Sequence, residues 1–310
     1  MNQKFFMMVG MPASGKSYKA QELAEEYNAE IFSSDALREE LFGDVNHQDN
    51  NHELFNELHR RIKACLKSGK SAIYDACNIS YKRRMAFIQE LKNIPCEKIC
   101  ILMATPYEEC LRRNSERERK VPEEVIKNMY MNFNVPYWYE GWDDIQVCYS
   151  DDAEKSTDIF YNIYFKNKMH SIWSYNQNNS HHTMTLGRHL YEAYNHVKRN
   201  NRDNDFNAEL EQAAALHDMS KPFCASFKNS KGEISDECHY YNHQYCSAYD
   251  SLFEKIIYNV DKLTVAVIIM WHMQPYFNKE EKTINKYKKL WGEKLYNDIM
   301  LLNEADKAAH

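Results

Sequence analysis

The chain has 310 residues, a formal net charge of −6, 44% hydrophobic residues and 27% charged residues. This length favours two domains, and the composition is that of a globular protein rather than a disordered one. The acidic balance gives no electrostatic basis for non-specific binding of long duplex nucleic acid, although a local basic groove for a short single-stranded end is compatible with it. No apolar run reaches membrane-spanning length, no signal peptide is recognisable, and the nine cysteines are scattered without a C-x-x-C pair. We therefore expect a cytoplasmic protein with reduced thiols and no membrane partner.

The first half of the sequence alternates between expected strands and expected helices. The expected strands are Phe5–Gly10, Ala29–Ser34, Ser71–Asp75, Lys98–Ala104 and Asp144–Tyr149. The expected helices between them are Lys16–Tyr27, Asp35–Phe42, Glu53–Lys67, Tyr81–Lys92, Pro106–Glu118 and Pro122–Phe133. This alternation predicts an α/β domain over residues 1–152, with a parallel sheet covered on both faces.

A phosphate-binding loop lies between the first strand and the first helix. The segment from Gly10 to Ser17 fits the pattern G-x-x-x-x-G-K-S. Its glycines allow the backbone N–H groups to point at phosphate oxygens, next to the positive end of a helix. Lys16 would reach the β- and γ-phosphates, and the Ser17 hydroxyl would hold Mg²⁺. The loop predicts binding of ATP or another nucleoside triphosphate through Gly10, Ala13, Ser14, Gly15, Lys16 and Ser17.

Two carboxylates follow later strands of the same domain. Asp35 comes directly after the second strand, where it could accept a proton from an attacking hydroxyl while Arg38 binds an acceptor phosphate. Alternatively, Asp35 caps a helix and Arg38 is a solvated surface residue. Asp75 ends the third strand and could lie near Mg²⁺, or it could be an ordinary turn residue.

A basic segment follows the fourth strand. Arg113 and Arg117 are four residues apart, so they share one face of the expected helix. Two guanidinium groups on one face can bind phosphoryl oxygens in a transition state. The alternative is a solvated helix stabilised by surface ion pairs.

The pattern changes after residue 150. We expect a linker over residues 153–178 and an all-helical domain over residues 179–310, with helices at Leu186–Lys198, Ala208–His217, Asn242–Phe253 and Lys262–Met270. Ten of the 13 histidines lie beyond residue 169. The second domain contains a widely spaced series of imidazoles and carboxylates: His189, His217, Asp218, His243, His272 and Asp306. Such groups suit divalent transition metals, and a carboxylate can bridge two ions. The alternative is a histidine-rich structural bundle.

The motifs of the first domain resemble the polynucleotide 5′-kinase family. They are Gly-x4-Gly-Lys-Ser (Gly10 to Ser17), Ser-x-Asp-x-x-Arg (Ser33 to Arg38), Asp-Ala-x-Asn (Asp75 to Asn78) and Arg-Asn-x-x-Arg-x3-Val-Pro (Arg113 to Pro122). The resemblance implies that Asp35 is the general base for a 5′-hydroxyl and that Arg38 binds the acceptor phosphate. It also implies that Arg113 and Arg117 bind donor phosphates from a lid. Cys77 departs from the family, which often has threonine there.

The histidine and aspartate series resembles the HD phosphohydrolase superfamily, from about His181 to Asp306. The resemblance implies a main metal site of His189, His217, Asp218 and Asp306, and a second ion held with His243 and His272. The metal would be Mn, Fe, Co, Ni or Zn. Lys221 matches the lysine that contacts substrate phosphate, and Ser220 stands where glycine is common.

The two resemblances together imply an enzyme that repairs the ends of RNA or DNA. It would phosphorylate 5′-hydroxyl ends and remove a 2′,3′-cyclic, 2′- or 3′-phosphate from single-stranded ends, preparing them for a nucleic-acid ligase. Similar bacterial fusions carry the HD domain first, so the domain order here is reversed. Two alternatives remain: a nucleoside or metabolite kinase fused to a nucleotide phosphohydrolase, and a regulatory ATPase with a nucleotide-sensing HD domain.

Overall fold

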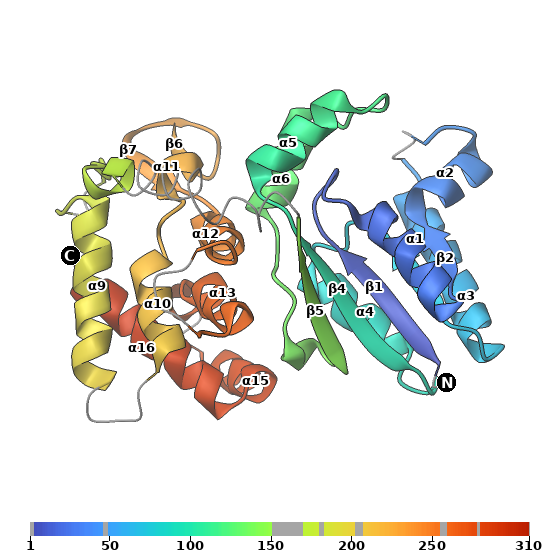
Figure 1. Ribbon diagram of the computed structural model, residues 1–310. Helices are drawn as coiled ribbons and strands as arrows, with labels where there is room; N and C mark the ends of the chain where they lie inside the picture. Colours follow the sequence, from blue (N-terminus) through green and yellow to red (C-terminus); the bar gives the residue numbers. More distant parts are fainter. Residues whose placement is uncertain are drawn as a thin grey trace. The chain divides into compact units, whose positions relative to one another are not determined.

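The computed structural model describes residues 3–45, 49–150, 170–179, 183–201, 207–254, 259–277 and 280–309. The chain divides into two compact units (Figure 1). Unit 1 comprises Met1–Met129 and Pro136–Asp151, and unit 2 comprises Tyr130–Val135 and Asp152–His310. The short segment Tyr130–Val135 therefore packs with the second unit although both flanking segments belong to the first. Most of the expected linker, residues 153–169, lies outside the described residues.

Unit 1 is built on a five-stranded sheet of order β2-β3-β1-β4-β5 in which every neighbouring pair is parallel. The strands are β1 (Lys4–Val9), β2 (Glu30–Ser33), β3 (Ala72–Asp75), β4 (Glu97–Ala104) and β5 (Asp144–Tyr149). The helices are α1 (Lys16–Tyr27), α2 (Ser34–Phe42), α3 (Asn51–Lys67), α4 (Tyr81–Glu90), α5 (Tyr107–Glu116) and α6 (Glu123–Met131), with a 3₁₀ turn at Trp138–Glu140. The expected α/β domain with a parallel sheet is confirmed.

Alternating side chains of the strands bury both faces of this sheet. On one face, Phe6 and Met8 of β1 pack with Leu23 of α1 in a buried apolar cluster. On the other face, the ring of Phe5 lies 5.5 Å from that of Phe87 in α4. A parallel sheet covered by helices on both sides needs such apolar strands, which explains why β1 is buried from its second residue onward.

A buried ion pair fixes the chain beyond β3. The Arg84 Nε and Nη2 groups donate to the two carboxylate oxygens of Glu140 at 2.7 and 2.6 Å, and neither side chain is accessible to solvent. Trp142 Nε1 donates to the same carboxylate at 3.1 Å, and Arg84 Nη1 donates to the carbonyl of Asn78 at 2.8 Å. A charge at this depth is tolerated because its hydrogen-bonding groups are paired.

Unit 2 is mainly helical. Its helices are α9 (Leu186–Asn201), α10 (Ala208–Leu216), α11 (Lys221–Cys224), α12 (His243–Ser251), α13 (Lys262–Trp271), α14 (Gln274–Phe277), α15 (Glu281–Trp291) and α16 (Glu293–Ala308). It also contains an antiparallel hairpin of β6 (Ala225–Lys228) and β7 (Ile234–Tyr240). The expectation of an all-helical second domain was wrong at this hairpin. Its turn contains Gly232 at a φ of +83°, and Asn229 accepts from two backbone N–H groups within the turn.

Helix α13 forms the centre of unit 2. Every residue from Val265 to Trp271 is buried, and α13 contacts α10, α12 and α16. A helix that is apolar on all sides is stable only where neighbours enclose it completely. Among the described residues, no helix combines the length and apolar content needed to cross a bilayer.

We predict that Arg84→Ala lowers the free energy of unfolding of unit 1 by about 3–5 kcal/mol, because it leaves the Glu140 carboxylate buried without its cation. Denaturant titration followed by tryptophan fluorescence would measure the change. Arg60→Ala is the matched control, since Arg60 forms an exposed ion pair with Glu57. Equal stability of the two variants would contradict a structural role for the buried pair.

Candidate functional sites

The phosphate loop follows β1 and opens α1, as expected. Ala13 and Gly15 adopt positive φ values of 61° and 96°, which turn the backbone sharply before the helix begins. A Cβ atom on Gly10 would lie 2.6 Å from the Ser14 hydroxyl, so the loop needs glycine there. The Lys16 ammonium group is buried against the loop, where it donates to the carbonyl of Met11 at 2.7 Å.

The structure brings Asp75 to the phosphate loop. Strands β3 and β1 are neighbours, so the residue that ends β3 lies beside the loop that follows β1. The Ser17 hydroxyl donates to Asp75 Oδ2 at 2.8 Å. A hydroxyl and a carboxylate oxygen at this distance are the hard oxygen ligands that Mg²⁺ prefers. The alternative of an isolated turn residue does not describe Asp75, which is buried.

Three further hydrogen bonds fix the phosphate loop against neighbouring strands. The Gly10 N–H donates to the carbonyl of Cys77 at 3.0 Å, and the Asn78 side chain donates to the carbonyl of Met8 at 2.9 Å. The hydroxyl of Thr105, directly after β4, donates to the carbonyl of Ser14 at 3.0 Å. Thr105 was not predicted as a site residue; its position directly after a strand was the available signal.

Asp35 lies in the first turn of α2, at the carboxyl edge of the sheet. The residue that caps this helix is Ser33, whose hydroxyl accepts from the N–H of Ala36 at 3.4 Å, so the capping alternative for Asp35 does not apply. Arg38 is buried rather than solvated, and it donates to Asp35 Oδ1 at 3.2 Å and to Asn51 Oδ1 at 3.0 Å. Its Nε atom has no hydrogen-bond partner within the described parts of the chain.

The arginines of the basic segment occupy different surroundings. Arg113 donates to Glu109 at 2.5 Å, and its Nη1 atom lies 3.9 Å from the point where a Cβ on Gly15 would stand. It therefore borders the phosphate loop. Arg117 is exposed at the C-terminal end of α5, so the structure does not bring the two predicted lid arginines to one site.

Arg119 was not predicted as a site residue, but its side chain reaches Asp35, the carboxylate expected to face the acceptor. It donates to Asp35 Oδ2 at 2.8 Å and to the carbonyl of Val45 at 3.2 Å. Arg113 of α5 thus borders the phosphate loop, and Arg119 of the segment after α5 lies beside the Asp35 carboxylate.

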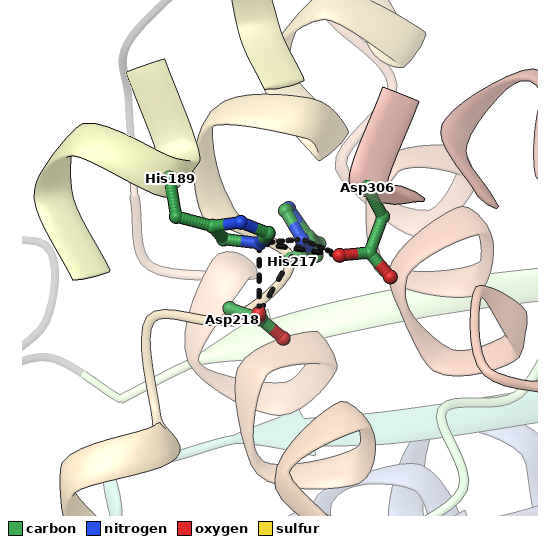
Figure 2. A group of neighbouring side chains, drawn as sticks. All are labelled: His189, His217, Asp218 and Asp306. Atoms are coloured by element: carbon green, nitrogen blue, oxygen red, sulfur yellow. Dashed lines mark hydrogen bonds and ion pairs between the residues drawn. The ribbon is translucent and has the colours of Figure 1, made fainter. Parts of the chain in front are cut away.

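Unit 2 gathers all six predicted metal-binding residues. His189 lies on α9, His217 and Asp218 follow α10, and Asp306 lies on α16; Figure 2 shows these four side chains converging. The two remaining histidines, at the start of α12 and directly after α13, approach Asp218. The candidate ligand atoms form two groups that share Asp218, and within each group they lie within 4.8 Å of one another.

The first group is tightly packed around one point. His189 Nε2 lies 3.1 Å from His217 Nε2 and 3.2 Å from both Asp218 Oδ2 and Asp306 Oδ1. His217 Nε2 lies 3.5 Å from the same two carboxylate oxygens. All four side chains are buried.

The backbone fixes the tautomer of every histidine in the cluster. Nδ1 contacts a backbone carbonyl in each case, at 2.6–2.9 Å: Ala309 for His189, Ala214 for His217, Tyr240 for His243 and Ile269 for His272. A carbonyl oxygen can only accept, so each Nδ1 carries the proton and each neutral ring presents an Nε2 lone pair to the cluster. Converging lone pairs and carboxylates repel one another unless a cation lies between them.

The second group contains buried atoms whose hydrogen-bonding capacity is unused. His243 Nε2 lies 3.0 Å and His272 Nε2 3.6 Å from Asp218 Oδ1. None of these three atoms makes a hydrogen bond within the described residues. Buried polar atoms without partners are destabilising, so a missing ligand is the simplest account of them. The donor set fits a second divalent ion bridged by Asp218.

The electrostatics of the cluster favour bound positive charge. Burial alone would raise the pKa of Asp218, but Lys221 and the neighbouring histidines hold it well below its ordinary range. Burial likewise opposes ionisation of Asp306, and hydrogen bonds from His189 and His217 outweigh it and lower its pKa. Burial also opposes protonation of His189, yet hydrogen bonds to the two aspartates raise its pKa to about 9. The carboxylates therefore hold a cation in the cluster, whether a proton or a metal ion.

Three side chains surround the ligands. Lys221 is buried and donates to Asp218 Oδ2 at 2.6 Å and to Gln177 Oε1 at 2.9 Å, so it reaches the metal ligands as predicted. Ser220 has a φ of −96°, a conformation that does not need the glycine common at this position. The Tyr276 hydroxyl donates to Asp306 Oδ2 at 2.8 Å and leaves Oδ1 directed at the histidines. Tyr276 was not predicted as a site residue, because a single tyrosine in a short segment does not indicate a ligand-binding role.

Comparisons with known proteins found one family match within the first unit and one curated relative. Residues 5–136 match the AAA_33 family model, described as an AAA domain. The chain is 30% identical over 162 residues to L-seryl-tRNA(Sec) kinase of Methanococcus maripaludis, and the alignment covers 48% of this chain and 59% of that relative. The chain thus spans little more than half the length of this curated relative.

Solved structures are similar to parts of the chain. The structure of the Pnkp1/Rnl/Hen1 RNA repair complex aligns with 23% identity and a TM-score of 0.36, covering 41% of this chain and 43% of that one. The Mycobacterium tuberculosis APS kinase CysC aligns with 15% identity and a TM-score of 0.37, covering 53% of this chain and 98% of that one. The sheet, the phosphate loop and the family match together make unit 1 an α/β P-loop domain of the kinase type.

Proposed function

We propose that the chain is a two-site enzyme that repairs nucleic-acid ends. Unit 1 transfers the γ-phosphoryl group of ATP to a 5′-hydroxyl, and unit 2 removes a 2′,3′-cyclic, 2′- or 3′-phosphate with divalent metal ions. One observation carries the proposal most: a chain with a phosphate loop and an acceptor-side carboxylate also holds six buried side chains suited to metal ions. Each activity forms one of the two ends that a nucleic-acid ligase joins.

In unit 1, the acceptor oxygen attacks the γ-phosphorus, the bond to the β-phosphate oxygen breaks, and ADP leaves. Asp35 accepts the proton of the hydroxyl, and Arg38, buried with an unpartnered Nε–H, binds the acceptor phosphate. Lys16 and Arg113 stabilise negative charge on the transferring group, because both lie at the phosphate loop. Ser17 and Asp75 would hold Mg²⁺, which neutralises the β- and γ-phosphates when bound.

The identity of the acceptor rests on the relative. An L-seryl-tRNA(Sec) kinase acts, by its name, on a hydroxyl carried by RNA. That similarity supports an RNA-linked acceptor over a free metabolite. It also favours a second candidate, the serine hydroxyl of a seryl-tRNA.

In unit 2, His189, His217, Asp218 and Asp306 would hold one divalent ion, and Asp218, His243 and His272 would hold another. Such ions acidify a bound water and neutralise phosphoryl oxygens. Lys221 would release Asp218 to the metal and bind a phosphate oxygen of the substrate, since its ammonium group already lies at the cluster. These buried, precisely oriented ligands support hydrolysis over a purely regulatory role.

The proposal is tested by incubating the full chain with γ-labelled ATP and four acceptors: 5′-hydroxyl RNA, 5′-hydroxyl DNA, seryl-tRNA and free nucleosides. We expect label on the oligonucleotides. Label on seryl-tRNA alone would assign the second candidate, and label on nucleosides alone would contradict both. An RNA ending in a 2′,3′-cyclic phosphate, supplied with Mn²⁺, tests unit 2.

We predict that Lys16→Ala and Asp35→Ala each abolish phosphoryl transfer and leave phosphate removal unchanged, because the two sets of residues belong to separate units. Both activities are measured on the same protein preparation. Loss of both activities in a folded Lys16→Ala protein would show that the sites are not independent.

We predict that Arg113→Ala lowers kcat for phosphoryl transfer by about a hundredfold, because a charge beside the transferring group is lost. Arg117→Ala, the other predicted lid arginine, is measured in parallel. A rise in KM for ATP with kcat intact would instead assign the residue to donor binding.

We predict that His243→Ala and His272→Ala each remove one metal equivalent and most phosphate removal, while leaving phosphoryl transfer intact. The reason is that His243 Nε2, His272 Nε2 and Asp218 Oδ1 make no hydrogen bond among the described residues, and a second ion would coordinate all three atoms. Elemental analysis of metal-replete protein measures the stoichiometry. His239→Ala is the matched control, since His239 bonds Ser235 on its own strand. One ion in the wild type, with both variants active, would leave His243 and His272 as structural residues.

A further inference from the structure

Two guanidinium groups hold the carboxylate of Asp35, one on each oxygen. Arg38, from the same helix, donates to Oδ1, and Arg119, 84 residues further along the chain, donates to Oδ2 at 2.8 Å. Among the described residues these are the charged groups that pair with Asp35. A carboxylate bound at both oxygens cannot rotate freely, so its remaining lone pairs have fixed directions.

The second contact of Arg119 ties the same carboxylate to the chain after α2. Arg119 Nη2 donates to the carbonyl of Val45 while Nη1 holds Asp35. The guanidinium group therefore connects the first turn of α2, through Asp35, to the segment after α2, through Val45. Lysine has a single charged nitrogen and cannot reproduce this fork.

We infer that Arg119 is a positioning residue for the acceptor base. This inference rests on the proposed transfer of a phosphoryl group to a hydroxyl. Arg119 orients Asp35 so that a free lone pair faces the acceptor hydroxyl when the segment between α5 and α6 lies over the site. Arg113 of the preceding helix α5 borders the phosphate loop, so α5 and the segment that follows it contribute to both the donor and the acceptor sides.

The chemistry gives Arg119 a measurable signature. As the acceptor oxygen bonds to phosphorus and ADP departs, the hydroxyl proton moves to Asp35. A carboxylate held in one direction accepts this proton in the productive geometry, so removing Arg119 should lower kcat without raising KM for ATP. Loss of a contact to the donor phosphates would instead raise KM for ATP.

The test measures kcat and both KM values for the wild type, Arg119→Ala, Arg119→Lys and Arg112→Ala. Arg112 is the control because it carries the same charge as Arg119. It lies on α5 and pairs only with Glu109 and Glu116 of that helix among the ion pairs of the described residues. We expect Arg119→Ala to lower kcat at least tenfold and to leave KM for ATP unchanged. Arg119→Lys should restore only part of kcat, because lysine cannot reproduce the two-pronged contact.

The inference is overturned if Arg119→Ala keeps the kcat of the Arg112→Ala control, or if its main effect is a raised KM for ATP. Failure of the proposed function is distinguishable. If the wild type phosphorylates no oligonucleotide but labels another hydroxyl acceptor, the acceptor assignment fails and the same comparison is made with that acceptor.

Discussion

Neutralisation of buried charge is the constraint on which unit 2 depends. Two carboxylates and four imidazole lone pairs meet in a space closed to solvent, and this arrangement is unfavourable unless positive charge is supplied. Backbone carbonyls hold the Nδ1 protons outward, so the rings cannot relieve the repulsion by changing tautomer. Lys221 and the raised pKa of His189 show that the site recruits cations even from the protein's own groups. Metal ions of suitable size satisfy the same constraint more completely.

In unit 1 the corresponding constraint is geometric. Parallel strands end at one edge of the sheet, so residues that follow different strands gather there although they are far apart in sequence. The loop after β1, Asp75 at the end of β3 and Asp35 after β2 meet in this way. Thr105 after β4 completes the series by bonding the loop. Charged and polar side chains at that edge are positioned by the sheet rather than by their neighbours in sequence.

Strongly periodic or strongly apolar segments were predictable. The strands and helices of unit 1 follow the expected order, and α1 begins and ends at the expected residues. The hairpin of unit 2 was not predictable, because β7 is a mostly polar strand with little alternation between apolar and polar residues. The terminal helices α15 and α16 were also not assigned. In α15 the helical spacing of Ile284, Tyr287 and Trp291 was an available signal, whereas α16 has little amphipathic pattern. Tertiary packing, rather than local pattern, defines the hairpin and α16.

The candidate site residues divide in the same way. Ligand residues could be proposed because imidazoles and carboxylates are the groups that divalent transition metals bind, and the structure brings all six together. The sequence could not predict which arginines of the basic segment reach the site. All are chemically equivalent there, namely Arg113, Arg117 and Arg119, and helical spacing groups only the first two. Helix α5 ends at Glu116, however, so spacing no longer fixes direction beyond it, and Arg119 is the residue that reaches Asp35.

The two sites differ in the ions that suit them, and this difference bears on how one chain could hold both. Ser17 and Asp75 offer only oxygen, which suits Mg²⁺, an ion that keeps several waters and binds together with substrate phosphates. The unit 2 cluster offers four imidazole nitrogens, which bind transition metals far better than Mg²⁺. Competition between the sites for one ion is therefore weak. If the proposed function holds, ions at the buried, nitrogen-rich cluster would bind independently of nucleotide, whereas Mg²⁺ at Ser17 and Asp75 would bind together with nucleotide.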